Sequence, residues 1–217
     1  MTELKSEIET YYSRRAYEYE QIYDKPERQD DLETLKQLVK NFLQNKSVLE
    51  IACGTGYWTK ILSNSANSIV AIDSSKEVLD IATLKSYQKR NVKFINDNAL
   101  SLSKIEDTFS ASFCGFWLSH ILKKNIESFL NNLHLKLKPG SIVVMIDNNF
   151  VEGSSTPVSR KDEGGNTYQL RKLENSSEYE VLKNFYSEDH LKKMFKNYSS
   201  NFEIINLKYY WMIKYKV

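Results

Sequence analysis

A glycine turn with an acid just ahead of it is the first candidate binding site in the sequence. In the stretch VLEIACGTGYWT (residues 48–59), Gly54 and Gly56 follow a short apolar run. Glycine permits positive φ angles and lets a ligand approach the main chain closely. Glu50 would repel a pyrophosphate here, and Thr59 stands where a dinucleotide fingerprint needs a third glycine. The turn therefore favours a cationic ligand with amine donors over a dinucleotide.

Two further acids follow at the ends of apolar runs. Asp73 ends the run SIVAID, and Asp97 comes directly after VKFIN. In an open α/β sheet, ligands bind beside the carboxyl ends of the strands. From these positions we expect Asp73 to bind the hydroxyls of a ribose and Asp97 to accept a hydrogen bond from an adenine amino group.

From residue 47 onward, short β-type runs alternate with helical stretches, and the three acids fall in or after the first three runs. This alternation predicts right-handed βαβ units, and hence a Rossmann-like α/β fold with a mostly parallel sheet and helices on both faces. Two late runs predict an antiparallel pair at one edge, which brings the sheet to seven strands. The predicted strands are Ser47–Ala52, Ser68–Asp73, Val92–Asn96, Ala111–Phe116, Ser141–Asp147, Phe202–Leu207 and Tyr209–Tyr215. The predicted helices are Tyr57–Ser63, Ser75–Lys89 (capped by Ser74 with Glu77), Asn125–Leu137 and Glu188–Phe195.

The N-terminal segment, residues 1–45, is predicted to be a helical cap ahead of a sheet domain at residues 46–217. Apolar and aromatic residues at three- and four-residue spacing indicate one helix up to about Tyr23 and a second from about Asp31. An insertion at about 148–184 separates the fifth strand from the Glu188–Phe195 helix. Its Gly164-Gly165 pair predicts a hairpin or flap.

Taken together, these motifs resemble those of the class I S-adenosylmethionine (SAM) dependent methyltransferases, over nearly the whole chain. VLEIACGTG resembles the first motif of that family, IVAIDSS the second and NDNAL the third. FSASFCGFWLSHI and LHLKLKPGSIVVMIDN resemble its fourth- and fifth-strand segments. One departure is Ala52, which replaces the first glycine of the first motif. The resemblance implies a small-molecule enzyme with SAM as methyl donor and S-adenosylhomocysteine (SAH) as product.

The resemblance also implies which residues hold the cofactor. The glycine turn and Glu50 would frame the methionine part, the acid after the second run would hold the ribose, and the fourth strand would line the sulfonium side. The implied cofactor residues are Tyr11, Tyr19, Glu50, Ala52, Gly54, Gly56, Asp73, Ser74, Asp97, Ala99, Cys114 and Gly115.

The methyl acceptor is expected beside the sulfonium, under the tyrosine-rich N-terminal segment and the insertion. His120 follows the fourth strand and could be a general base for a hydroxyl or amine, or a group that binds an acid. A half-buried structural histidine is the alternative. Arginine suits bidentate recognition of a carboxylate or phosphonate. The candidate acceptor-binding residues are Tyr12, Trp117, Arg160, Tyr168 and Arg171.

GTGYWT, GFWLSH and VLKNFYSEDHLKK are similar to segments of small-acid O-methyltransferases of the carboxylate and phosphonate type. O-methylation of a small acid is therefore the expected activity, with N-methylation of an amine or amino sugar as the alternative. An NAD(P)-dependent oxidoreductase and a non-catalytic SAM-binding protein stay open as hypotheses of other classes.

Composition limits the partners. The 217 residues carry 30 basic and 28 acidic side chains, and no run of cations predicts a nucleic-acid partner. We expect no membrane span and no signal peptide, hence a cytoplasmic monomer or homodimer. Cys53 and Cys114 lack metal or redox spacing, so we expect buried thiols and no metal.

Overall fold

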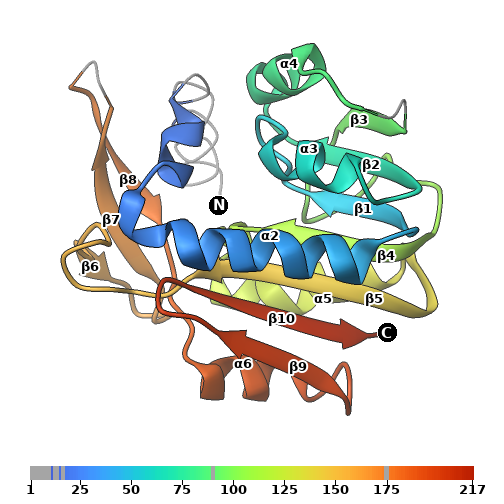
Figure 1. Cartoon of the computed structure of the whole chain (residues 1–217). Helices are drawn as coiled ribbons and strands as arrows, with labels where there is room; N and C mark the ends of the chain where they lie inside the picture. Colours follow the sequence, from blue (N-terminus) through green and yellow to red (C-terminus); the bar gives the residue numbers. More distant parts are fainter. Residues whose placement is uncertain (1–10, 12–14, 16–17, 89–90, 174–175) are drawn as a thin grey trace.

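A seven-stranded sheet forms the centre of the protein (Figure 1), with strand order β3-β2-β1-β4-β5-β10-β9. The computed structural model describes residues 11, 15, 18–88, 91–173 and 176–217. The strands are β1 (Ser47–Ile51), β2 (Ser68–Asp73), β3 (Val92–Asn96), β4 (Phe109–Gly115), β5 (Leu137–Asn148), β9 (Phe202–Asn206) and β10 (Tyr210–Lys216). β1 pairs parallel with β2 and β4, whereas β10 runs antiparallel to β5 and β9. The predicted fold class is confirmed.

Helices cover both faces of this sheet because each presents an apolar stripe to it. The first face carries α2 (Gln29–Leu43), α3 (Tyr57–Ser63) and α4 (Lys76–Leu84), with Leu35, Leu62 and Leu79 in one buried cluster. The other face carries α5 (Ile126–His134) and α6 (Glu188–Phe195), with Phe129 and Phe195 in the second cluster. No helix in the described segments is long and apolar enough to cross a bilayer.

The order of the strands places a crevice at the carboxyl ends of β1 and β4. From β1 the chain continues outward through β2 and β3, whereas β4 lies on the other side of β1 and leads to β5. Ile51 and Cys114 are partners in the β1–β4 ladder, so both strands end at the same level. Just beyond, Ala52 has φ 51° and Phe116 has φ 58°. Positive φ at a non-glycine residue is strained and is concentrated at functional sites.

The predicted insertion forms a second, smaller sheet, with strand order β6-β7-β8. It contains β6 (Arg160–Lys161), β7 (Thr167–Lys172) and β8 (Glu178–Leu182), all antiparallel. The hairpin around Gly164-Gly165 is thus confirmed, and β8 adds a strand that the sequence pattern did not indicate. We call these three strands the accessory sheet.

Four 3-10 helices complete the described elements: η1 (Tyr19–Tyr23), η2 (Pro26–Arg28), η3 (Leu118–His120) and η4 (Lys123–Asn125). We call residues 18–28, which contain η1 and η2, the cap. Figure 1 shows the cap in blue between the accessory sheet and α3 and α4. α2, which was predicted to belong to the helical cap, packs on the main sheet. The division at residue 45 into a helical cap and a sheet domain therefore stays a prediction.

Two predicted boundaries were wrong at α4. The helix ends at Leu84 rather than Lys89, because Lys85 adopts an extended backbone with ψ 146°. Its N-cap is Ser75 rather than Ser74, since Ser75 Oγ accepts the backbone amide three residues on at 3.4 Å.

The corner Lys138-Pro139-Gly140 was predicted to separate a helix from a strand, but it lies inside β5. The β4–β5 register shifts in this region, from Phe109 opposite Leu137 to Ala111 opposite Ile142. The corner is therefore a bulge that the sheet absorbs, with Gly140 N bonded to Val217 O at 2.7 Å.

Candidate functional site

Asp73 joins the glycine turn to the start of α4. Its Oδ2 accepts a hydrogen bond from Gly54 N at 2.9 Å, and its Oδ1 accepts one from Ser75 N at 3.0 Å. The acid at the end of β2 therefore shapes the turn as well as facing the crevice. Each carboxylate oxygen has a second acceptor site, so the contact with a ribose stays a prediction. Ser74 is exposed, and its carbonyl binds Asn96 Nδ2 at 2.9 Å.

Glu50 is a buried acid in the centre of the sheet. It is 1% exposed, and its Oε2 has no hydrogen-bond partner among the described residues. Burial, with a smaller contribution from the charge of Asp73, raises the pKa of Glu50 to about 8. A carboxylate oxygen held in this way fits a cationic ligand, and SAM carries both an ammonium and a sulfonium. The residues present therefore fit this cofactor.

Gly56 is required by packing as well as by its backbone angle. It has φ 80°, and a Cβ added there would lie 2.7 Å from Tyr87 Oη and 3.1 Å from Ala82 Cβ. No other residue can replace it without moving the segment after α4. Ala52, where the family pattern has glycine, accepts positive φ at some cost in strain.

Asp97 organises the loop after β3. Its carboxylate accepts hydrogen bonds from Asn98 N at 2.8 Å, Ser103 Oγ at 3.1 Å and Lys104 N at 2.9 Å. Ala99 is buried against the second apolar cluster below this loop. The loop is thus fixed in shape, while the contact of both residues with an adenine stays a prediction.

The Cys114 side chain does not line the sulfonium side as predicted. Its thiol is 1% exposed and lies in the apolar cluster on the α5 face, where burial raises its pKa. The neighbouring Gly115 faces the other way: a Cβ there would meet the ring of Phe113 at 3.1 Å and Trp58 at 3.4 Å.

A cavity of about 560 Å³ lies between the cap and the accessory sheet, next to the end of β4. Phe116 and His120 line it from β4 and η3, Tyr210 from β10, and Leu170 and Phe185 from the insertion and the segment after it. The basic residues that line it are Arg15, Lys25, Arg28, Arg171, Lys172 and Lys183. Among the described lining residues, Glu18 is the one acid. We call this cavity the acceptor pocket.

Of the predicted acceptor residues, Arg171 lies in this pocket. Its guanidinium donates to Gln169 Oε1 at 2.8 Å and lies 5.8 Å from the ring centre of Tyr11. Tyr11, predicted to contact the cofactor, is buried here on the acceptor side, where Arg15 donates to its hydroxyl at 2.9 Å. Tyr12 and the side chain of Tyr19 lie outside the described residues.

Three other predicted acceptor residues lie elsewhere. Arg160 forms an exposed ion pair with Glu180 at 2.6 Å and lies over the ring of Tyr168. Tyr168 is itself buried, with its hydroxyl on Asp162 at 2.9 Å. Trp117 stacks on Phe129 of α5, with ring centres 5.5 Å apart. All three therefore stabilise the scaffold around the pocket instead of lining it.

His120 is held as a neutral ring. Its Nδ1 lies 2.6 Å from Leu182 O, and a carbonyl can only accept, so Nδ1 carries the hydrogen. Burial lowers the pKa of His120 well below its usual value, and the charges of Lys183 and Arg171 lower it further. In this tautomer Nε2 is a hydrogen-bond acceptor, which favours a role towards a donor on the substrate over binding of an anion as an imidazolium.

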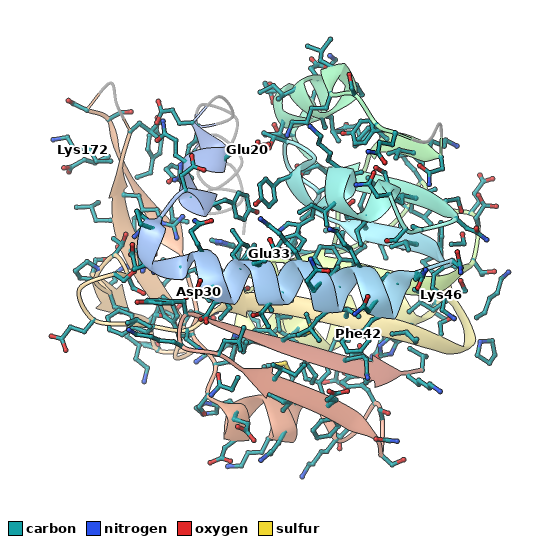
Figure 2. All side chains as sticks on the ribbon, in the orientation of Figure 1. Glu20, Asp30, Glu33, Phe42, Lys46 and Lys172 are labelled. Atoms are coloured by element: carbon teal, nitrogen blue, oxygen red, sulfur yellow. The ribbon has the colours of Figure 1, made fainter. Side chains whose placement is uncertain are left out.

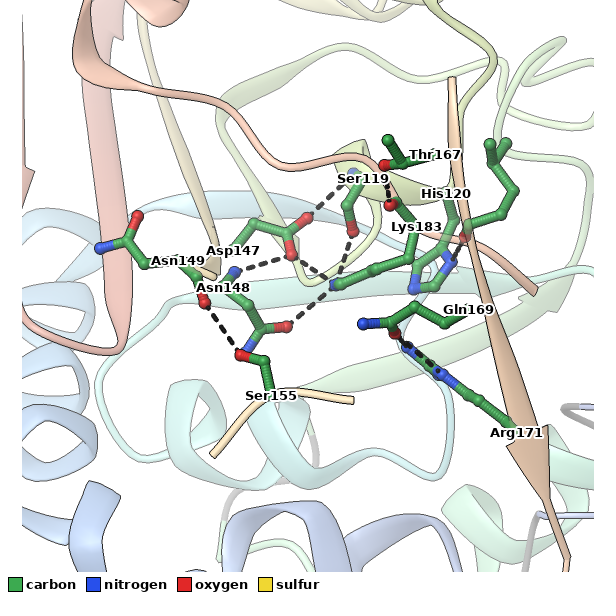
Figure 3. Close-up of polar contacts among 11 residues, drawn as sticks. Ser119, His120, Asp147, Asn148, Asn149, Ser155, Thr167, Gln169, Arg171 and Lys183 are labelled. Carbon is green, nitrogen blue, oxygen red and sulfur yellow. Dashed lines mark hydrogen bonds and ion pairs between the residues drawn. The ribbon is translucent and has the colours of Figure 1, made fainter. Parts of the chain in front are cut away.

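Lys183 is a pocket residue that the sequence reasoning missed. Figure 3 shows its ammonium surrounded by three acceptors: Ser119 Oγ at 2.7 Å, Asp147 Oδ1 at 2.8 Å and Asn148 Oδ1 at 2.9 Å. Asp147 also accepts Ser119 N at 2.9 Å. Asp147 could be recognised in the sequence as an acid at the end of a predicted strand. Its partner Lys183 lies in the insertion, and no motif around it indicates this pairing.

Arg28 is a second residue that was missed, because KPERQD reads as an exposed connection. The Arg28 side chain is 7% exposed, donates to Ser154 Oγ at 2.8 Å and lies 5.2 Å from the ring centre of Tyr209. Among the described residues, no carboxylate forms an ion pair with it. The carboxylate of Glu27 accepts a hydrogen bond from the same Ser154 hydroxyl at 2.7 Å, so this acid acts on Arg28 through Ser154 and not as a direct partner. An anionic ligand would supply the direct partner.

Residues 48–140 match the family described as "Methyltransferase domain". Curated relatives include a demethylmenaquinone methyltransferase of Lactococcus lactis, 33% identical over 110 residues, which cover 48% of this chain and 43% of the relative. One from Bacillus licheniformis is 28% identical over 141 residues, covering 59% and 60%. The chain thus spans only about half the length of the curated relatives it matches.

Solved structures share the fold over more of the chain. DhpI in a complex titled with SAM and HEP has a TM-score of 0.81 and 23% identity, covering 99% of this chain and 98% of that one. A SAM-dependent methyltransferase from Clostridium acetobutylicum has a TM-score of 0.63 and 19% identity, covering 93% and 98%.

The sheet order, the glycine turn and the buried Glu50 define a Rossmann-like domain of the methyltransferase type. Residues 48–140 thus match a methyltransferase domain, and the chain shares its fold with solved SAM-dependent methyltransferases.

Proposed function

We propose that the protein is a class I SAM-dependent methyltransferase that methylates an oxygen of a small acid, a carboxylate or a phosphonate. The charge of the acceptor pocket carries this proposal. Six basic residues and one acid line it among the described residues, and Arg28 is buried there without a carboxylate partner. An anionic acceptor supplies the missing counter-charge, and arginine binds such groups through two parallel hydrogen bonds.

An acidic acceptor also needs no base to remove a proton before methyl transfer. When bound, SAM supplies an electrophilic methyl group on a sulfonium. An ionised acid oxygen is already a nucleophile, so the residues of the chain need only hold and align it. The new O–CH3 bond forms as the S–CH3 bond breaks, and SAH leaves without a proton transfer. Neutral His120 would accept a hydrogen bond from a hydroxyl of the acceptor or from a singly protonated phosphonate.

The curated relatives give a second candidate, a demethylated menaquinone as acceptor. Their matches extend over about half of the chain, and the family match is confined to residues 48–140. Among the described residues that line the acceptor pocket, all but Phe116 and His120 lie outside residues 48–140. An uncharged quinone would bring no negative charge to the six basic residues that line the pocket, so we favour an acid. N-methylation of an amine is disfavoured for the same reason, since an ammonium would enter a cationic pocket.

Release of SAH from SAM over a panel of acceptors tests the proposal. The panel contains alkyl phosphonates, hydroxy and keto carboxylates, primary amines, phenols and a short-chain demethylmenaquinone. We expect turnover with one of the acids and none with the amines. Turnover confined to the quinone or to an amine would contradict the assignment.

A further inference from the structure

Glu20 joins three separate segments of the protein through one carboxylate oxygen. It lies in η1 of the cap, and its Oε1 accepts a hydrogen bond from Thr55 Oγ1 at 2.6 Å. The same oxygen forms an ion pair with Lys85, the residue directly after α4. Thr55 is 1% exposed and lies inside the glycine turn. Hydrogen bonds to an ionised acceptor are about twice as strong as neutral ones, so this contact ties the cap to the donor side of the crevice.

The cap makes a second contact beside the glycine turn, two residues after Thr55. Tyr23, one helical turn after Glu20, stacks on Tyr57 with ring centres 3.8 Å apart and an angle of 10° between the rings. Tyr57 is the first residue of α3. The cap therefore holds Thr55 and Tyr57, the two residues on either side of Gly56, where packing leaves no room for a side chain.

The cap also builds one wall of the acceptor pocket. Glu18, Gln21 and Ile22 line the cavity from η1 and the residue before it, and Arg28 lines it from η2. A shift of the cap relative to the glycine turn must therefore move pocket residues. Glu20 itself does not line the pocket. Its effect on the acceptor can only pass through the position of the cap.

We propose that Glu20 is a positioning residue that fixes the cap over the glycine turn, so that SAM binding and formation of the acceptor pocket depend on each other. The part that concerns the acceptor rests on the proposed function. A ligand that orders the glycine turn also orders Thr55, the partner of Glu20. A cap that Glu20 holds in place stabilises the glycine turn in return. Such coupling between two sites is reciprocal in free energy.

An ordinary surface ion pair would not have this effect. Exposed pairs contribute little to stability, and the Glu20 side chain is 39% exposed. The difference lies in Thr55, whose buried hydroxyl loses its acceptor when Glu20 is removed. The cost therefore falls on the glycine turn, where the donor binds, and not on the surface.

The experiment compares Glu20→Ala, Glu20→Gln and Lys85→Met with wild type. Glu188→Ala is the matched control, because Glu188 is an exposed acid that pairs with Lys192 on α6. Figure 2 shows α6 at the bottom of the view, away from the labelled Glu20 at the top. SAH affinity is measured by calorimetry, and hydrogen exchange is followed at the amides of Gln21 and Asp24. These amides bond to Glu18 O and Gln21 O within the cap, both at 3.1 Å, so they report its order.

For Glu20→Ala we expect SAH affinity to fall about tenfold, the loss of one charge-assisted hydrogen bond, and SAH to stop protecting the cap amides. Glu20→Gln and Lys85→Met should lose less, and Lys85→Met should add nothing to Glu20→Ala. Glu188→Ala should match wild type.

Wild-type SAH affinity and unchanged cap protection in Glu20→Ala, even with a lower melting temperature, would overturn the inference and leave the proposed function intact. If Glu20→Ala fails to fold, equal SAH affinity in Glu20→Gln, Lys85→Met and wild type would overturn it. A wild-type protein that binds no SAH would overturn the proposed function itself, and the inference with it.

Discussion

Lys183 and Asp147 form an ion pair that is almost entirely removed from solvent. Nζ lies 2.8 Å from Oδ1, and the two side chains are 5% and 1% exposed. The pair joins the residue after β8 of the accessory sheet to the carboxyl end of β5. It therefore holds the accessory sheet, which carries Arg171, in place over the crevice.

Removing one partner of this pair should be more damaging than removing both charges. Asp147→Ala leaves a buried ammonium without a counter-charge, and we expect a loss of about 3–5 kcal/mol in the free energy of unfolding. Urea denaturation measures it. The double variant Asp147→Asn with Lys183→Met should lose less than Asp147→Ala, because no buried charge is left unpaired. A loss in the double variant that equals the sum of the losses in the two single variants would show that the pair does not act as a unit.

Glu50 should make SAM binding and stability respond to pH in opposite ways. Its pKa of about 8 lies above the unfolded value of 4.5, so its contribution to stability is present below pH 4.5 and is lost as pH rises through 8. The ammonium group, which SAH shares with SAM, is bound better by the ionised form of Glu50, so SAH affinity should rise over the same range. Glu50→Gln should therefore unfold at a higher temperature than wild type at pH 9, yet bind SAH more weakly. Thermal scans and calorimetry at pH 6 and pH 9 check both; a Glu50→Gln protein with wild-type affinity at pH 9 would remove Glu50 from the site.

Asp73→Ala should cost roughly 1.5–3 kcal/mol of SAH binding, the scale of a hydrogen bond to a charged group. Two effects combine in this variant: loss of the predicted ribose contact, and loss of the bond to Gly54 N at 2.9 Å, which shapes the turn. Adenosine contains the ribose but not the methionine part, so its affinity for the variant separates the two effects. Unchanged affinity for both ligands would contradict the assignment.

Arg171 and Arg160 offer a matched comparison within the accessory sheet. Arg171 lines the acceptor pocket, whereas Arg160 is paired with Glu180 on the surface. Arg171→Gln should raise the KM for the acid acceptor about 10- to 100-fold, the loss of a charge-assisted contact, with SAH affinity unchanged. Arg160→Gln should leave KM near wild type. Equal effects of both changes would mean that Arg171 acts through the fold and not through the acceptor.

His120 should show no titration near pH 6.5 in the folded protein, because burial and the neighbouring cations lower its pKa. An unfolded histidine binds a proton near pH 6.5, so stability should fall as the pH drops below that value. Replacement by glutamine should reduce this loss. The pH profile of kcat/KM for a carboxylate acceptor, which stays ionised over this range, should be flat through 6.5; a rise centred there would show that His120 acts as a general base.

Local patterns predicted the sheet and the cofactor side of the site because both depend on residues adjacent in sequence. The glycine turn, Glu50 and Asp73 lie within two strands and their connection, and the pleat places them together. The acceptor side depends on contacts between distant segments. Nothing near Lys183 in the sequence indicates Asp147, and Arg28 reads as exposed until Ser154 and Tyr209 are seen around it. From the sequence, Arg160 and Arg171 of the insertion were equal candidates for binding the acceptor. The structure distinguishes them, because Arg160 is paired with Glu180.

The identity of the methylated atom tests the central claim most directly. The protein is incubated with 13C-methyl SAM and the best acceptor of the panel, and the product is analysed by NMR and mass spectrometry. We predict one added methyl group on an acid oxygen, with the chemical shift of a methyl ester and lability to alkali. A 13C-methyl group on carbon or nitrogen would contradict the proposal that the cationic pocket presents an acid to the methyl donor.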